Sequence, residues 1–208
     1  MLKLDLKRKL RHLYNPSPRQ PEIVEAPAMN YLMIDGAGDP NISPAYQEAV
    51  SALYSLAYTI KFMLKKSADG LDYTVMGLEG LWWAGNMDQF SLNRKDDWLW
   101  TMMILQPEFV TAEHVSRGRD EAARKRDLPA LDRVRLESFH EGLCAQIMHI
   151  GPYAAEAPTI EKLHEFIAAG GYIRRGKHHE IYLSDPNRVA PERLKTIIRQ
   201  PVDAAHAG

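Results

Sequence analysis

One order of elements occurs in both halves of this sequence, and it constrains the fold more than any other feature. The apolar run from Met29 predicts a strand, and the turn over Gly36–Asn41 leads to a helix and then to two aromatic-rich strands. In the second half, a strand over Leu143–Ile150 leads through Gly151 to another helix and two more strands. This order predicts an α+β fold in which duplicated β-α-β-β modules share an antiparallel sheet, with helices on one face and a ligand cleft on the other.

The first predicted helix carries the strongest pattern in the chain. Ser43 is the expected N-cap, and Pro44 occupies the first turn, where proline is favoured. Lys65 and Lys66 end the helix, since cations stabilise the negative end of the helix dipole. Between these ends, apolar residues recur at three- and four-residue steps: Tyr46, Ala49, Val50, Leu53, Leu56, Ala57, Ile60, Met63 and Leu64.

Shorter patterns predict the remaining elements. Residues 194–202 begin with the pattern of a last helical turn and end with the pattern of an edge strand. An edge strand is expected because Pro201 lacks the N–H that a central strand needs. A polar loop separates the two aromatic-rich strands. The other expected elements are strands at 73–83, 98–105, 133–137 and 179–183 and helices at 107–127 and 158–170.

The first residues are basic and are expected to precede the main domain as a leader. Leu6, Leu10 and Leu13 fall at helical spacing, so a short amphipathic helix packing on the domain is the simpler interpretation. A basic segment at a membrane surface is the alternative. The expected boundaries are 1–24 for the leader, 25–208 for a single domain, about 28–127 for module one and about 131–202 for module two.

Composition excludes several classes of protein. The 208 residues contain 26 Lys and Arg against 27 Asp and Glu, a balance that argues against a nucleic-acid-binding face built on overall charge. No apolar run approaches the ~18 residues that a membrane span needs. Cys144 is the single cysteine and cannot form an internal disulfide, so we expect a cytoplasmic protein. Because Cys144 falls on a predicted strand, we expect its side chain to be a small buried one. We expect neither direct nucleic-acid binding nor a membrane partner.

Common cofactor and metal motifs do not match. The pair Gly36 and Gly38 follows a strand, but Asn41 stands where a dinucleotide fingerprint has its third glycine. His178 and Glu180 share one face of a strand while His179 points to the other, so this run is not expected to hold a metal. We therefore expect no cofactor and no metal.

The residues that stand out are aromatic rings near carboxylates. Strand parity places Trp98, Trp100 and Met102 on one face, and Glu79, Leu81 and Trp83 together on one face. Near the end of the chain, Ile181 and Leu183 are expected to meet the helices, which leaves Glu180 and Tyr182 on the open face. A carboxylate among rings suits a flat, partly cationic ligand. The candidate ligand-binding tryptophans are Trp82, Trp83, Trp98 and Trp100.

Six sequence blocks, in order, carry a family resemblance: NYLMIDGAGDPN, LYSLAYTIKF, LEGLWW, EGLCAQIMHIGPY, HHEIYLSDP and LKTIIRQPV. Together they resemble the stand-alone branch of the GyrI-like small-molecule-binding proteins, from about Glu25 to Val202. The resemblance implies two β-α-β-β modules related by a pseudo-twofold axis, with a concave ligand cleft between them. Nothing in the chain resembles the helix-turn-helix half of related transcription activators, so we do not expect such an activator.

The resemblance also implies roles for particular residues. Related domains sense drugs in multidrug-responsive activators, where an acid in an aromatic pocket meets planar cations, and Glu180 of HHEIY matches that acid by position. One subfamily uses an aromatic cage to hydrolyse the strained cyclopropane of DNA-alkylating natural products, and by this likeness Glu180 or Glu79 orients water. The cage residues implied are Trp83, Trp100 and Tyr182, together with Tyr31 or Tyr153.

Three functional hypotheses follow. The first is a protective binder of small planar or partly cationic molecules of the xenobiotic type. The second is a cofactor-independent hydrolase that opens strained electrophilic ligands in the same site. The third is a protein-binding inhibitor or shield of a target enzyme, which an exposed apolar patch in place of a ligand site would favour.

Overall fold

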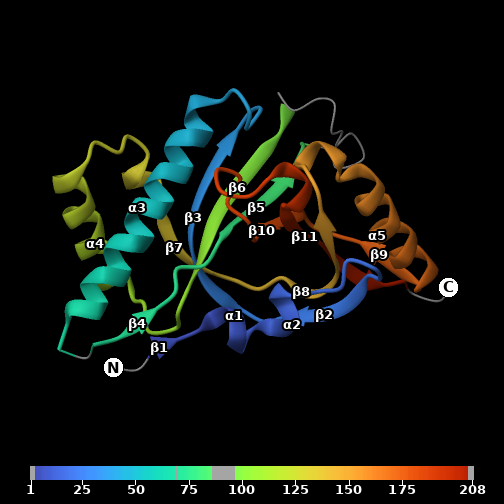
Figure 1. Cartoon of the computed structure of the whole chain (residues 1–208), viewed down its shortest axis with the longest axis horizontal. Helices are drawn as coiled ribbons and strands as arrows, with labels where there is room; N and C mark the ends of the chain where they lie inside the picture. The colour runs from blue at the N-terminus through green and yellow to red at the C-terminus, as the bar shows by residue number, and fades with distance from the viewer. Residues whose placement is uncertain (1–2, 69, 86–96, 206–208) are drawn as a thin grey trace. The chain divides into compact units, whose positions relative to one another are not determined.

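The computed structural model describes residues 3–68, 70–85 and 97–205 (Figure 1). Contacts between residues divide the chain into two compact units. Unit 1 comprises Met1–Lys9 and Met29–Phe139, and unit 2 comprises Leu10–Ala28 and His140–Gly208. Each unit combines antiparallel strands with helices, which confirms the predicted α+β class (Figure 1). The polar loop predicted between the aromatic-rich strands falls mostly on 86–96, outside the described residues.

Unit 1 contains an antiparallel sheet in the strand order β5-β6-β3-β7 and a short parallel pair of β1 with β4. The register places Trp82 opposite Trp100 and Tyr31 opposite Leu105. The elements of unit 1 are β1 (Lys3–Leu4), α1 (Leu6–Lys9), β3 (Met29–Ala37), α3 (Pro44–Lys66), β4 (Asp72–Tyr73), β5 (Leu78–Trp83), β6 (Leu99–Gln106), α4 (Ala112–Lys125), η3 (Leu131–Arg133) and β7 (Arg135–Phe139).

Helix α3 begins and ends where the sequence predicts. The Ser43 hydroxyl accepts a hydrogen bond of 3.4 Å from the backbone N–H of Tyr46, and Pro44 is the first helical residue. The apolar stripe of α3 packs on β3 and β6, and α4 packs on α3. A Cβ at Gly118 would lie 2.7 Å from Cγ1 of Ile60, so glycine is what lets α4 approach α3 this closely.

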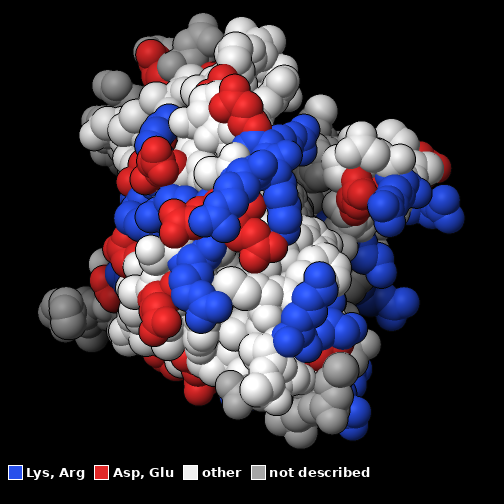
Figure 2. All heavy atoms as spheres, turned by 90° about the vertical axis from the view of Figure 1, so that its left-hand side faces the viewer, with Lys and Arg blue, Asp and Glu red and all other residues white. Residues whose placement is uncertain are grey.

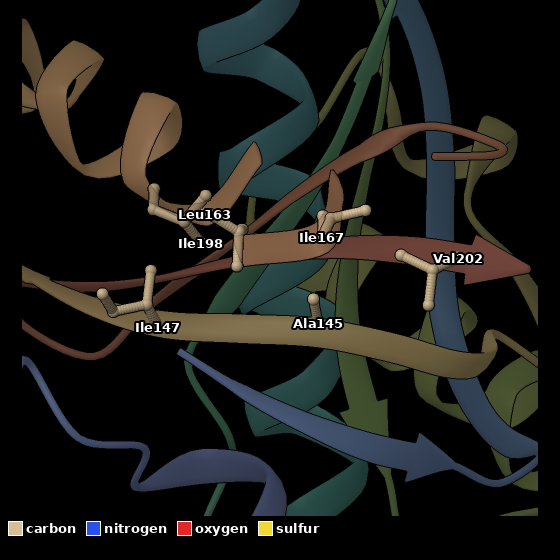
Figure 3. Packing of buried hydrophobic residues seen from close by; sticks show 6 residues of the cluster. All are labelled: Ala145, Ile147, Leu163, Ile167, Ile198 and Val202. Carbon is tan, nitrogen blue, oxygen red and sulfur yellow. The ribbon is translucent and has the colours of Figure 1, made fainter. Parts of the chain in front are cut away.

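Unit 2 contains an antiparallel sheet in the strand order β2-β8-β11-β10, and β9 pairs with the end of β11. Helix α5 packs on β8 and β11 through the buried cluster of Ala145, Ile147, Leu163, Ile167, Ile198 and Val202 (Figure 3). The elements of unit 2 are α2 (Arg11–Tyr14), β2 (Glu22–Ala26), β8 (Gly142–Ile150), η4 (Tyr153–Ala155), α5 (Ala157–Ala169), β9 (Tyr172–Arg174), β10 (His178–Tyr182), η5 (Pro191–Arg193) and β11 (Lys195–Ala204).

The prediction of an edge strand at 194–202 is wrong, because β11 lies between β8 and β10. Proline is tolerated there for a local reason. Strand β10 pairs with Thr196–Arg199 and β9 pairs with Val202–Ala204, so Pro201 falls in the gap between the two partners. The missing N–H therefore costs no ladder hydrogen bond on that side.

The segment predicted as a leader contributes buried side chains. Leu13 is fully buried and Tyr14 is 5% exposed, and both belong to unit 2 by their contacts. None of the helices in the described part of the chain is long and apolar enough to cross a membrane.

Candidate functional site

A buried carboxylate on β10 is the centre of the candidate site in unit 2. Glu180 is 8% exposed, and its Oε2 accepts a hydrogen bond of 2.7 Å from the hydroxyl of Tyr182. Its Oε1 lies 3.1 Å from Nε2 of His178. The three side chains share one face of the strand, because alternate residues point the same way. The strand thus holds the carboxylate between a phenol and an imidazole.

Side chains on neighbouring elements extend this site. The ring of Tyr153 in η4 packs edge-on against Tyr182, with 5.5 Å between centroids, and Tyr153 is 40% exposed. On β11, Thr196 lies opposite Tyr182 of β10 on one side and opposite His149 of β8 on the other. Nδ1 of His149 lies 2.9 Å from the hydroxyl oxygen of Thr159. Thr196 is fully buried, and its hydroxyl finds no hydrogen-bond partner among the described residues.

The prediction that Glu180 and Tyr182 occupy a helix-free face is wrong. Glu180 pairs with Ile198, and Ile198 pairs with Ile147, so the three lie on one face of the sheet. Ile198 and Ile147 belong to the cluster that packs under α5 (Figure 3). By strand pairing, Glu180 therefore lies on the helix-bearing face. Ile181, which was expected to meet the helices, lies on the opposite face and is also buried.

That opposite face of unit 2 carries a buried ionic network. Arg199 is fully buried and donates to Glu141 Oε2 at 3.2 Å, to Gln146 Oε1 at 2.9 Å and to the backbone carbonyl of Leu13 at 2.7 Å. His179 Nδ1 lies 2.9 Å from Oε1 of Glu141. Burial raises the pKa of Glu141, but the charges and hydrogen bonds of His179 and Arg199 outweigh it and lower this pKa to about 2. Through the hydrogen bond from Arg199, the network binds the backbone of Leu13 to the sheet of unit 2.

An aromatic cluster in unit 1 contains three of the tryptophans. Trp82 pairs with Trp100 across β5 and β6, and its ring lies 5.3 Å from that of Trp98. Tyr46 of α3 packs against Trp82 at 6.1 Å and against Trp100 at 5.4 Å between centroids. The Trp100 ring also covers Gly36, where a Cβ would lie 2.1 Å from a ring carbon. These rings therefore fill the α3 face of the sheet with the unit's own side chains.

The second carboxylate lies on the other face of the unit 1 sheet. Glu79 is fully buried and pairs with Met103, while Trp83 on the same face is partly exposed. Tyr31 lies on this face too, with its ring 6.3 Å from that of Phe139. Ring contacts thus join Trp82 with Trp98 in unit 1 and Tyr153 with Tyr182 in unit 2. Tyr31 and Trp83 share the Glu79 face but lie at opposite ends of it, since they pair with the β6 residues Leu105 and Leu99.

Comparison with known proteins places this arrangement in a family. A family sequence model described as "GyrI-like small molecule binding domain" matches residues 19–203. The chain belongs to the GyrI-like family. No curated protein matches the chain.

Solved structures agree with this assignment. A structure of an uncharacterized conserved protein from Listeria innocua is 43% identical, with a TM-score of 0.89, and the match covers 96% of this chain and all (100%) of that one. Two structures of hydrolases from the same organism are also similar. The first is 42% identical, with a TM-score of 0.86, and the match covers 97% of this chain and 100% of that one. The second is 41% identical, with a TM-score of 0.83, and the match covers 96% of this chain and 100% of that one.

Sequence reasoning missed part of the site in this GyrI-like domain. His178 contacts Glu180, and Thr196 and His149 continue the same face, but these residues come together only through the register of three strands. Glu156, at the start of α5, is a further buried carboxylate and is 4% exposed. Strand parity placed His178 on the face of Glu180 but assigned it no role in the site, whereas nothing in the sequence indicates the register that adds Thr196.

Other candidates for chemistry have structural roles. Cys144 is fully buried, as predicted, and burial raises the pKa of its thiol, which favours the protonated form over a nucleophilic thiolate. In the described ranges of the GyrI-like chain, no group of three or more His, Cys, Asp or Glu side chains is arranged to hold a metal ion.

Proposed function

We propose that this GyrI-like chain binds small planar or partly cationic organic molecules of the xenobiotic type at the Glu180 site, and that binding is protective because it sequesters them. The observation that carries the proposal is the buried Glu180 carboxylate, which Tyr182 and His178 hold in one orientation. A fixed carboxylate in a poorly solvated setting attracts a cation more strongly than one in water. The family's description as a small-molecule-binding domain supports the same function.

The rings beside Glu180 suit the flat part of such a ligand. Tyr182 and Tyr153 offer large rigid surfaces that lose little conformational entropy on binding. Tyr153 is exposed enough to meet a ligand from solvent. The Thr196 hydroxyl lies on the same face and supplies a polar atom for a ligand group. In unit 1, Glu79 with Trp83 is the second candidate pair for ligand binding.

Two ligands with similar rings and different charge test this proposal. Isothermal titration calorimetry with cationic 9-aminoacridine and neutral acridone separates the role of the carboxylate from that of the rings. We expect Glu180→Gln to weaken 9-aminoacridine binding about tenfold or more, the range of a charge-assisted hydrogen bond, and to leave acridone binding nearly unchanged. The control is Glu165→Gln, which removes an exposed carboxylate of α5. Equal affinity of wild type and Glu180→Gln for the cation would contradict the proposal.

Hydrolysis is the second candidate function, favoured by the two Listeria innocua hydrolases at 42% and 41% identity. In this reaction, Glu180 accepts a proton from water while the water oxygen attacks a carbon of a strained three-membered ring. A C–O bond forms, the ring C–C bond breaks, and its electron pair moves into a conjugated carbonyl. Glu180 then returns the proton to that oxygen, so the net change is the addition of one water and no cofactor is consumed. Glu79 is the second candidate base.

Turnover and binding distinguish the two functions. A spirocyclopropyl cyclohexadienone is a suitable probe, since ring opening by water changes its absorbance and adds the mass of one water. Under the hydrolase hypothesis, Glu180→Gln abolishes turnover while the probe still binds. Turnover that persists in Glu180→Gln and stops in Glu79→Gln would transfer the role of base to Glu79. A probe that binds to the wild type without turnover would leave sequestration as the function.

A further inference from the structure

A groove in unit 1 lies between the C-terminal half of α3 and the exposed side of α4. Its volume is about 540 Å³, within the range of small-molecule sites. It shares no residue with the Glu180 site or with the ring clusters. The residues that line it are Phe62, Met63, Leu64, Lys66, Ser67, His114, Arg117, Glu121 and Lys125.

The α3 side of the groove is apolar. Phe62 is 47% exposed, an unusual position for a large ring, and it continues a stack with Tyr58 and Tyr54 along the helix, with centroids 6.3 and 6.4 Å apart. Lys61 Nζ lies 4.2 Å from the centroid of Phe62. These contacts hold the ring of Phe62 in place, so an apolar ligand part finds a preformed surface.

The α4 side and the end of the groove are cationic. Lys66 extends from the last turn of α3, and Arg117 and Lys125 project from α4. Glu121 is the one carboxylate among the described residues of the lining, and it forms an ion pair with Lys125. The hydrogen bond that Lys125 donates to Glu121, together with the charge of Lys66, lowers the pKa of Glu121. The pair of Glu121 and Lys125 therefore stays ionised. Arg117 lies 3.9 Å from Glu113, an exposed pair of little strength, so Lys66 and Arg117 leave the lining with a net positive charge.

The face around the groove carries charges of both signs, and one contact of His114 adds a donor to the lining. Figure 2 shows Lys and Arg side chains with Asp and Glu side chains among them on the side of the molecule where α3 and α4 lie. His114 accepts a hydrogen bond at Nδ1 from the backbone N–H of Thr111, which leaves Nε2 as the nitrogen that carries hydrogen. His114 therefore adds a donor to the lining and no acceptor.

We propose that this groove binds small amphipathic organic anions, with the apolar part against Phe62 and Met63 and the anionic group held by Lys66 and Arg117. Charge complementarity and the apolar wall select this class: a neutral apolar molecule offers the two cations no counter-charge, and a cation is repelled by them. The groove and the Glu180 site therefore prefer ligands of opposite charge. The proposal does not depend on the function proposed for Glu180.

Two probes with the same chain length and opposite charge test this assignment. Octanoate and octylammonium are titrated into the ¹⁵N-labelled full chain, and amide shifts are followed by NMR, which locates the bound probe by residue. We expect saturable shifts around Phe62 and Arg117 with octanoate and none there with octylammonium. The double variant Lys66→Gln/Arg117→Gln should weaken octanoate binding about fivefold, or ~1 kcal/mol, the size expected for two solvent-exposed charge contacts.

The matched control is Arg124→Gln/Arg126→Gln. It removes the same charge from exposed positions at the end of α4 that do not line the groove. Octanoate affinity that stays within twofold of wild type in this control supports a specific site. Equal weakening in both double variants, equal binding of octylammonium in the groove, or octanoate shifts confined to other residues would overturn the proposal.

Discussion

The Tyr182 hydroxyl donates a hydrogen bond of 2.7 Å to Glu180, two residues earlier on the same face of β10. This bond fixes the orientation of the carboxylate without adding a positive charge. Tyr182→Phe keeps the ring and removes the donor. We expect the variant to bind 9-aminoacridine roughly tenfold more weakly, since hydrogen bonds to charged groups contribute about 1.5–3 kcal/mol. Calorimetry measures the change, and an affinity equal to that of wild type would show that the hydroxyl does not orient Glu180.

The buried network around Glu141 predicts a specific loss of stability in acid. The pKa of Glu141 falls from its usual 4.5 to about 2 in the folded chain, so its carboxylate stabilises the fold above pH 4.5. This contribution is lost as the pH falls from 4.5 towards 2, and it amounts to roughly 3 kcal/mol at 1.36 kcal/mol per pKa unit.

Urea unfolding at several pH values measures this contribution. Glu141→Gln should lower the free energy of unfolding by roughly 3 kcal/mol at pH 7, because Arg199 and His179 lose a charged partner. The difference from wild type should shrink as the pH approaches 2. Glu165→Gln, at an exposed position, serves as the control. A difference that stays constant across this range would contradict the role assigned to Glu141.

The close contact of Trp100 with Gly36 predicts a strong effect of one methyl group. Gly36→Ala places a Cβ 2.1 Å from a ring carbon of Trp100, so the ring and its neighbours Tyr46 and Trp82 must shift. We expect a loss of about 1–3 kcal/mol in unfolding free energy, as for other overpacked cores. Gly85→Ala is the control, since no atom of the described residues lies within 4 Å of the place that its added methyl group would take. Similar melting temperatures for the two variants would be evidence against the tight contact.

The buried hydroxyl of Thr196 predicts a change in the opposite direction. The hydroxyl finds no hydrogen-bond partner among the described residues, and an unpaired buried polar group is destabilising. Thr196→Val keeps the shape and should raise the unfolding free energy by about 1 kcal/mol. If Thr196 bonds the ligand, the same variant also binds its ligand more weakly. A clear loss of stability on removing the hydroxyl would mean that it has a partner in solution.

Local signals made most of the fold predictable. The cap at Ser43, the proline at Pro44 and the stripe of α3 act within a few residues, so the helix follows from sequence alone. The face of Glu180 did not follow, because parity shows which residues share a face but not which face meets a helix. Ile197 and Ile198 are neighbours on β11 and both are fully buried, so the sheet of unit 2 has two covered faces.

Long-range pairing sets the rest of unit 2, on both faces of its sheet. Arg199 meets Leu13 across most of the chain, and Thr196 joins Tyr182 only through strand register. Neither contact leaves a spacing pattern that a single sequence reveals. For the same reason, the sequence analysis did not predict the buried ion pair of Glu141 and Arg199.

A crystal structure of the chain with 9-aminoacridine would show directly whether Glu180 binds a planar cation. We expect the acridine ring to pack on Tyr153 and Tyr182, with a ligand N–H about 3 Å from a carboxylate oxygen of Glu180. A ligand bound elsewhere, with Glu180 and Tyr182 in contact only with each other and with protein, would contradict this expectation.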